Sequence, residues 1–244
     1  MLLSAQGVSK SFGGFLAVAD ASLEVGEGEI VGIIGPNGAG KSTFFNCLAG
    51  DLVPSGGRIV FDAADLTHAS PEAHARRGIG RTFQVPTTFA EMTILENVMV
   101  GAFLRHPRLS EAREAARQVL ELTGLAGLAE QPAGSLGTPG RKRLEIARVM
   151  ATAPRLLLLD EALAGLTPAE IQTAIALLRR IHASGVTLVI VEHIMEVILT
   201  LAERVTVFNQ GRVIAHGRPQ EIVRDEAVID AYLGRAHARR AQQQ

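Results

Sequence analysis

The stretch GPNGAGKST at residues 35–43 constrains this chain more than any other feature. It has the spacing Gly-x-x-x-x-Gly-Lys-Ser/Thr, with the apolar run EIVGIIG (29–35) before it and a helical pattern from Lys41 to about Ala49 after it. A strand, a glycine-rich turn and a helix in this order are typical of a phosphate-binding loop. An ordinary tight turn is the alternative, and the flanking strand and helix argue against it.

The residue types in this loop match the needs of a nucleoside triphosphate with Mg²⁺. Glycines let the backbone N–H groups approach phosphate oxygens, the lysine places a cation on the β- and γ-phosphates, and the first hydroxyl residue is offered to Mg²⁺. The predicted nucleotide-binding residues are Gly35, Asn37, Gly38, Gly40, Lys41, Ser42 and Thr43, with Ser42 also a metal ligand.

Two adjacent carboxylates follow a second buried strand, in RLLLLDEALAGL (155–166). Ligands of open α/β sheets bind at the carboxyl ends of the strands. Asp160 is therefore predicted to hold Mg²⁺, and Glu161 to polarise the water that attacks the γ-phosphate. A strand-end pair that merely meets solvent is the alternative.

Polar residues end two further apolar runs. Gln84 ends GIGRTFQ (78–84), and His193 follows VTLVIVE (186–192). The amide oxygen of Gln84 is predicted to touch Mg²⁺ or the attacking water, and His193 to donate to the γ-phosphate. Taken alone, each is more often a surface residue at a strand terminus. Phe12 either stacks on the adenine ring or staples the amino-terminal strands.

The order of apolar runs predicts an α/β fold. Buried parallel strands are expected at 29–35, 78–84, 155–160 and 186–191, and helices at about 41–49, 93–103, 110–123, 139–152 and 168–183. The amino-terminal part alternates polar and apolar residues, which predicts an antiparallel sheet. We expect a single domain, 1–244, with an inserted helical subdomain at approximately 87–150.

Composition excludes some classes. The formal net charge is −1, which gives no electrostatic reason to bind nucleic acid. One cysteine rules out an intramolecular disulfide. The longest apolar runs have the length of strands, and the amino terminus lacks the pattern of a signal peptide, so we expect a chain without membrane spans that can still dock on a membrane protein.

Together these residues resemble the ATP-binding subunits of ABC transporters, from GVSKSFGGFLAV to AYLG at 231–234. The wording GIGRTFQ, RKRLEIAR, VEHIM and NQGRVIAHGRPQEI is most similar to branched-chain amino acid importers, and to urea and amide importers. In that family GPNGAGKST is the Walker A loop, Gln84 the Q-loop glutamine, LLLLDE Walker B, LAGLTP (163–168) the D-loop and His193 the switch histidine. Ala162 and Ile194 depart from common family residues without removing a functional group.

The resemblance implies partners and a location. The family forms head-to-tail dimers in which each ATP lies between one chain's Walker A loop and the other's signature loop. It implies membrane permease subunits, docked near residues 84–100, and indirectly a periplasmic solute-binding protein. A second ABC ATPase subunit is the expected dimer partner, at the cytoplasmic side of the inner membrane.

The signature loop is altered. Aligned on RLEIAR, the family's LSGGQ falls on LGTPG (136–140), where Gly137 replaces a serine and Pro139 a glycine. Thr138 is predicted to cap the helix, leaving the N–H groups of Gly140 and Arg141 for a phosphate. Gly137, Thr138 and Gly140 are therefore predicted contacts, in an opposite site that binds ATP but hydrolyses it slowly. A two-residue slip onto SLG (135–137), or a loop irrelevant to nucleotide, are the alternatives.

Three other functions compete with an importer ATPase. A lipid-type ABC exporter ATPase has a similar sequence. Soluble ABC ATPases that act on DNA or ribosomes carry long insertions or two nucleotide-binding domains. A P-loop kinase or GTPase leaves His193 unexplained. The transported solute is not encoded in this chain, because selectivity lies in other subunits.

Overall fold

The computed structural model describes residues 1–84 and 87–233. The chain divides into two compact units, one formed by residues 1–73 together with the chain from 189 onward, and one by residues 74–188. Within the described residues, no helix is long and apolar enough to cross a membrane.

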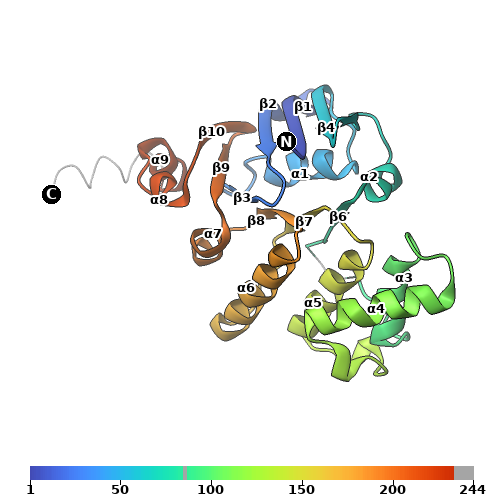
Figure 1. Ribbon diagram of the computed structural model, residues 1–244. Coiled ribbons are helices and arrows are strands. Elements are labelled where there is room, and N and C mark those ends of the chain that lie inside the picture. Colours follow the sequence, from blue (N-terminus) through green and yellow to red (C-terminus); the bar gives the residue numbers. More distant parts are fainter. Residues whose placement is uncertain (85–86, 234–244) are drawn as a thin grey trace. The chain divides into compact units, whose positions relative to one another are not determined.

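The first unit contains an antiparallel sheet built from the amino-terminal strands (Figure 1). Its order is β2-β1-β4-β5, with β1 Leu3–Phe12, β2 Phe15–Val25, β4 Gly56–Phe61 and β5 Ala64–Asp65. Side chains along β2 alternate between buried and exposed from Ala19 to Val25, as expected for a sheet with one covered face. The predicted antiparallel sheet is confirmed.

The same unit contains the strand that leads into the phosphate loop. β3 (Ile30–Ile34) pairs in parallel with β9 (Arg204–Asn209), and β10 (Arg212–Gly217) runs antiparallel beside β9. All five residues of β3 are buried, which explains its continuous apolar sequence. The helices of this unit are α1 (Lys41–Ala49), α7 (Met195–Leu201), α8 (Pro219–Ile222) and α9 (Glu226–Leu233).

The second unit pairs the strands that precede the predicted glutamine and carboxylates. β6 (Ile79–Arg81) runs parallel to β7 (Leu156–Asp160), with Ile79 opposite Leu156. Two elements contain the boundary between the units, α2 (Pro71–Arg77) and β8 (Thr187–Val191). At the start of β8, the N–H of Thr187 donates to Arg155 O at 2.9 Å. Just after β8, the N–H of Glu192 donates to Ile33 O at 3.4 Å.

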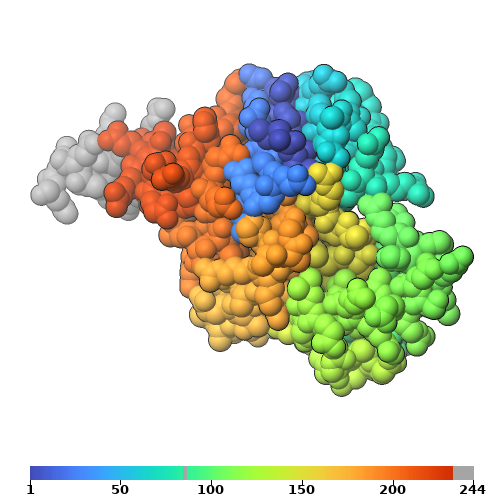
Figure 2. Space-filling view, in the orientation of Figure 1, coloured from blue at the N-terminus to red at the C-terminus, as the bar shows by residue number. Residues whose placement is uncertain are grey.

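Helices form the rest of the second unit (Figure 1). They are α3 (Ile94–Ala102), α4 (Leu109–Thr123), the 3₁₀ turns η1 (Ala126–Leu128) and η2 (Ala133–Ser135), α5 (Thr138–Met150) and α6 (Pro168–Ala183). α3, α4 and α5 share a core of leucine, alanine, valine and methionine, and Figure 2 shows their side chains (green to yellow-green) closely packed. Gly101 sets the spacing of α3 and α5, because a Cβ there would lie 2.0 Å from Arg148 O.

Helix ends follow sequence signals where these exist. Thr93 and Thr167 begin α3 and α6 as capping boxes, each accepting the N–H of a glutamate three residues later, Glu96 and Glu170. The parallel and antiparallel strands, together with the helical segment, match the α/β architecture expected from the sequence. β9, β10, α2 and α7 to α9 were not predicted as elements.

Candidate functional site

The phosphate loop has a backbone that only glycine allows. Gly35 has φ 150°, and a Cβ there would lie 2.1 Å from Phe208 O. Gly40 has φ 96°, and its Cβ would lie 2.5 Å from Ala17 O. Either side chain would force the backbone of a neighbouring strand to move. The glycines of the motif therefore fix how closely the loop packs on β2 and β9.

Lys41 lies inside the loop. It is only 6% exposed, and its Nζ donates to Gly35 O at 2.7 Å and Pro36 O at 2.9 Å. Lys41 is also the first residue of α1, and Gly40, which has no side chain, is the N-cap. The first N–H groups of α1 and the positive end of its dipole therefore face the loop without a side chain over them. A triphosphate fits this loop, because donors and a cation converge on it.

The remaining loop residues present polar groups toward solvent. Asn37 and Ser42 are exposed, Thr43 is half-buried, and a Cβ at Gly38 would meet nothing within 4 Å. Gly211, in the turn between β9 and β10, ties the loop to β2. Its N–H donates to Ala39 O at 2.9 Å, and its carbonyl accepts the N–H of Ala19 at 2.8 Å. Gly211 was not predicted as a contributor.

Phe12 and His193 belong to the same unit. Phe12 is the last residue of β1, pairs with Phe15 across the hairpin, and is 46% exposed. The Lys10 ammonium lies 5.2 Å from its ring centroid. The ring therefore lies outside the buried core, and the Lys10 ammonium makes a cation–π contact with it. His193 is exposed and lies two residues after β8.

In the second unit, Asp160 is the last residue of β7 and is buried. Its Oδ2 lies 3.7 Å from Arg81 Nη2, and its N–H donates to Thr82 Oγ1 at 3.4 Å. A buried carboxylate needs such partners to stay ionised. Neither Arg81 nor Thr82 was singled out from the sequence.

Glu161 and Gln84, predicted to act on the same water, lie together. Gln84 Nε2 donates to Glu161 Oε2 at 2.9 Å, which leaves the amide oxygen of Gln84 for a metal or water. Glu161 has φ 45°, a left-handed conformation that costs energy for a residue with a Cβ. Two donors hold its carbonyl, Ala164 N–H at 3.1 Å and Lys142 Nζ at 3.4 Å.

The prediction that Gln84 ends a strand is wrong. β6 stops at Arg81, and the last ladder bond runs from Thr82 N–H to Leu158 O at 2.9 Å. The next N–H, that of Phe83, turns away and donates to Glu145 Oε1 at 3.0 Å. Glu145 lies on α5, and no motif of the sequence indicates this contact.

The altered loop at 136–140 differs from expectation in two ways. Gly137, not Thr138, is the N-cap of α5, and Thr138 is the first helical residue. The N–H of Arg141 is not available to a ligand, because it donates to Gly137 O at 3.0 Å. Pro139 has no N–H, so Thr138 and Gly140 remain the donors of the first turn. Ser135, the basis of the alternative alignment, lies in η2 and its hydroxyl donates to Pro132 O at 2.7 Å.

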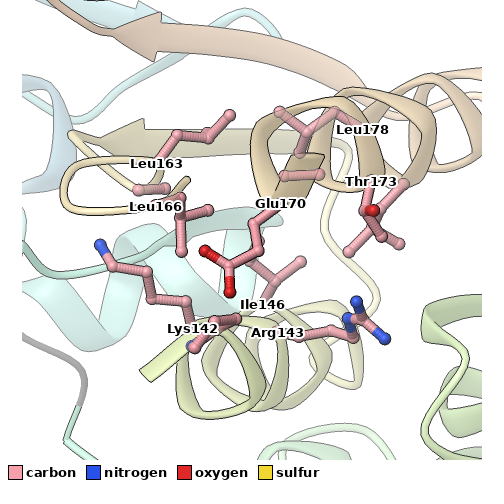
Figure 3. A pocket seen from close by; sticks show the side chains of 12 residues that line it. Lys142, Arg143, Ile146, Leu163, Leu166, Glu170, Thr173 and Leu178 are labelled. Carbon is pink, nitrogen blue, oxygen red and sulfur yellow. The ribbon is translucent and has the colours of Figure 1, made fainter. Parts of the chain in front are cut away.

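A cavity of about 70 Å³ lies behind this loop, between α5, the turn at 162–166 and α6 (Figure 3). Leu163, Leu166 and Ile146 supply its apolar wall, and the carboxylate of Glu170 points into it. This space separates the helix that begins with the altered loop from the turn that follows Glu161.

Comparisons with known proteins agree with this geometry. Residues 18–164 match the family described as ABC transporter, and residues 212–238 the family described as branched-chain amino acid ATP-binding cassette transporter. The chain is 43% identical to the high-affinity branched-chain amino acid transport ATP-binding protein LivG of Salmonella typhimurium, over 96% of this chain and 98% of that protein. It is 36% identical to the lipopolysaccharide export system ATP-binding protein LptB of Escherichia coli strain K12, over 95% and 97%.

A solved structure is also similar along nearly the whole chain. It is the ADP conformation of an ATP-binding cassette of an ABC transporter, 32% identical, with a TM-score of 0.87 over 96% of this chain and 98% of that chain. Structure and sequence therefore point to one family.

Proposed function

The chain belongs to the ABC transporter family, among the ATP-binding subunits of branched-chain amino acid importers, and from this membership we propose how its residues act and what it energises. The family shows that the chain is an ATP-binding and ATP-hydrolysing subunit. We propose that it drives import of a branched-chain amino acid or a related small solute. The match at residues 212–238 supports this choice.

The observation that carries the assignment of roles is the 2.9 Å hydrogen bond from Gln84 to Glu161. An amide and a carboxylate joined in this way can hold one water between a base and an acceptor. Glu161 is the proposed general base, with Gln84 its partner. His193 is the proposed donor to the γ-phosphate, and Phe12 the surface on which adenine stacks.

Lys41 and the loop residues of the first unit are the proposed triphosphate site. Mg²⁺ is the proposed cofactor, with Ser42, Gln84 and Asp160 as its protein ligands. A hydroxyl, an amide oxygen and one carboxylate suit Mg²⁺, which usually takes few protein ligands and completes its shell with water and phosphate. When bound, the metal neutralises phosphate charge as the γ-phosphate is attacked.

The proposed assembly follows from the same family. The chain is proposed to work as one nucleotide-binding domain over 1–244, with a helical subdomain at about 87–150. It is proposed to associate peripherally with membrane permease subunits, at the cytoplasmic side, near residues 84–100, of which 85–86 lie outside the described residues. A periplasmic solute-binding protein takes part indirectly.

We also propose that the two ATP sites of the dimer are unequal, with a second ABC ATPase subunit as partner. The loop at 136–140 supports this, because Gly137 offers no hydroxyl and Pro139 no N–H. Within the first turn of α5, the backbone N–H groups of Thr138 and Gly140 remain as donors toward the partner's ATP. The site that contains this loop is expected to bind ATP and hydrolyse it slowly.

The variant Glu161→Gln tests the assigned roles. It removes the base and keeps the shape of the side chain, so the purified complex should bind ATP and lose turnover at this site by about 10²-fold or more. Phosphate release and nucleotide affinity are measured side by side. Glu121→Gln, an exposed carboxylate on α4, is the control and should hydrolyse normally. Hydrolysis by Glu161→Gln at the wild-type rate would remove Glu161 from the mechanism.

Lipid export is the second candidate, supported by the 36% identity to LptB. Purification of the complex through a tag on this chain separates the two. Two permease subunits together with a periplasmic amino-acid-binding protein support import. Lipid-transport subunits in their place would support export and contradict the importer proposal.

A further inference from the structure

The last residue of β6 and the three residues after it contact the two acidic residues of Walker B and one further acid. Arg81 lies beside Asp160, and Thr82 accepts the N–H of the same residue. Phe83 donates its N–H to Glu145, and Gln84 donates its amide to Glu161. Three of these contacts lead to β7 or the residue after it. Only the contact of Phe83 leads to α5.

Glu145, which accepts the N–H of Phe83, is a buried carboxylate. It is 3% exposed, and Leu144 and Ile146 on either side of it are also buried. Burial is the main cause that raises the pKa of the Glu145 carboxyl, while the N–H of Phe83 and the charges of Arg148, Lys142 and Arg81 lower it. An apolar side chain would fill this position at less cost, so the oxygen at 3.0 Å from Phe83 N is the feature that the site gains.

The hydrogen bond between Phe83 and Glu145 fixes the position of the backbone from which the Gln84 side chain extends. Gln84 is exposed, and its side chain loses rotamer freedom when it reaches Glu161. The neighbouring peptide group is fixed by Glu145, so the amide starts from a defined backbone position. That bond holds the backbone N–H of Phe83, while the Arg81 guanidinium, 4.7 Å from the Phe83 ring centroid, contacts the side chain.

We propose that Glu145 is a positioning residue for ATP hydrolysis, which holds the backbone at Phe83 so that Gln84 engages Glu161. The inference rests on the proposed roles of Gln84 and Glu161. It adds a residue of α5 to the machinery of this chain's own site. Glu145 touches neither nucleotide nor water in this scheme and acts through Gln84.

Two substitutions of Glu145 in the complex test it, with MgATP as substrate. Glu145→Ala removes the acceptor, and Glu145→Gln keeps an amide oxygen that can accept the same N–H. Misplacement by about 1 Å costs up to 10²-fold in rate. We therefore expect Glu145→Ala to lower kcat about 10- to 100-fold with little change in KM, and Glu145→Gln to restore most of the loss. Amide exchange at Phe83 should be faster in Glu145→Ala alone.

Thr67→Val is the matched control for a purely structural bond. Thr67 is also buried, and its Oγ1 accepts the N–H of Ile59 at the same distance of 3.0 Å, in the other unit. Its loss should lower the melting temperature and leave kcat unchanged. A fall of kcat in Thr67→Val in proportion to its stability loss would mean that stability, not positioning, explains the effect of Glu145.

Combination with Gln84→Ala gives the decisive result. If Glu145 acts through Gln84, the double variant Glu145→Ala/Gln84→Ala is no slower than Gln84→Ala alone. If the losses in kcat of the two single variants multiply in the double variant, the inference is overturned. A Glu145→Gln variant that is as slow as Glu145→Ala would also overturn it. Failure of the proposed function looks different, because Gln84→Ala would then hydrolyse at the wild-type rate by itself.

Discussion

Gly137→Ser is expected to restore activity to the ATP site that contains the altered loop. The backbone accepts the change, since Gly137 has φ −68° and ψ 173°, a conformation open to any residue. A Cβ there would have Pro139 Cδ as its nearest neighbour at 3.9 Å, an ordinary contact. Gly137 is the N-cap of α5, a position that serine accepts as readily as glycine. The variant is therefore expected to be at least as stable as the wild type.

The gain in rate follows from the added hydroxyl. Loss of one transition-state donor usually costs about 10²–10³-fold in kcat, and Pro139 still withholds its N–H. We expect partial recovery, by about tenfold or more, at the site that this loop faces. Gly137→Ala is the control, since it adds the same Cβ without a hydroxyl and should leave that rate unchanged.

The assay isolates the site by silencing the other one. The complex carries Glu161→Gln in this chain, and phosphate release is compared with and without Gly137→Ser. The idea that Gly137 limits this site would be refuted if the rates of phosphate release with and without Gly137→Ser were nearly equal. This holds for a complex whose melting temperature and ATP binding are unchanged. An equal contribution of both Walker B glutamates in the wild type would refute the inequality itself.

Three further outcomes are expected. Lys41→Ala should abolish ATP binding, and unchanged affinity in equilibrium binding would contradict the assignment of the loop. Cys47 should react with a disulfide reagent at pH 8 only as fast as the protein unfolds, because its thiol is buried out of reach of the reagent, and burial also raises the pKa of the thiol to about 11; labelling within seconds in the native state would contradict this. Gly101→Ala should lower stability by about 2–3 kcal/mol, or the melting temperature by roughly 4–12 °C, because its Cβ meets Arg148 O at 2.0 Å. Gly127→Ala, with nothing within 4 Å, should be neutral or slightly stabilising in the same calorimetric scan.

The parts of the fold that sequence predicted well are those where burial is complete. β3, β7 and β8 are buried along their whole length, so each reads as an apolar run with clear ends. β10 is only half-buried, and α7 to α9 have four to eight residues. Short elements of mixed polarity give weak periodicity, and tertiary contacts decide their form.

For the candidate site, sequence predicted the residues of motifs and missed those that hold them. Glu161 could be named because it directly follows a buried strand, whereas Gln84 was named from a strand end that lies three residues earlier in the structure. Glu145 could not, since a glutamate within a helix is usually exposed and its burial depends on where the chain leaves β6. The predicted cap of α5 was also wrong by one residue. Thr138 was expected to be the N-cap, but the N-cap is Gly137 and Thr138 is the first helical residue.

The turn at Gly211 has a consequence for the order in which the protein becomes functional during synthesis. The phosphate loop is encoded at 35–43, yet its carbonyl at Ala39 is held by Gly211, and β3 pairs with β9 at 204–209. At about 5–20 residues per second, a ribosome needs roughly 10–30 s to travel from the loop to this turn. A nascent chain therefore carries its nucleotide loop without the support of β9 and Gly211 for most of its translation. The chain should bind ATP stably only after the hairpin of β9 and β10 has emerged from the ribosome.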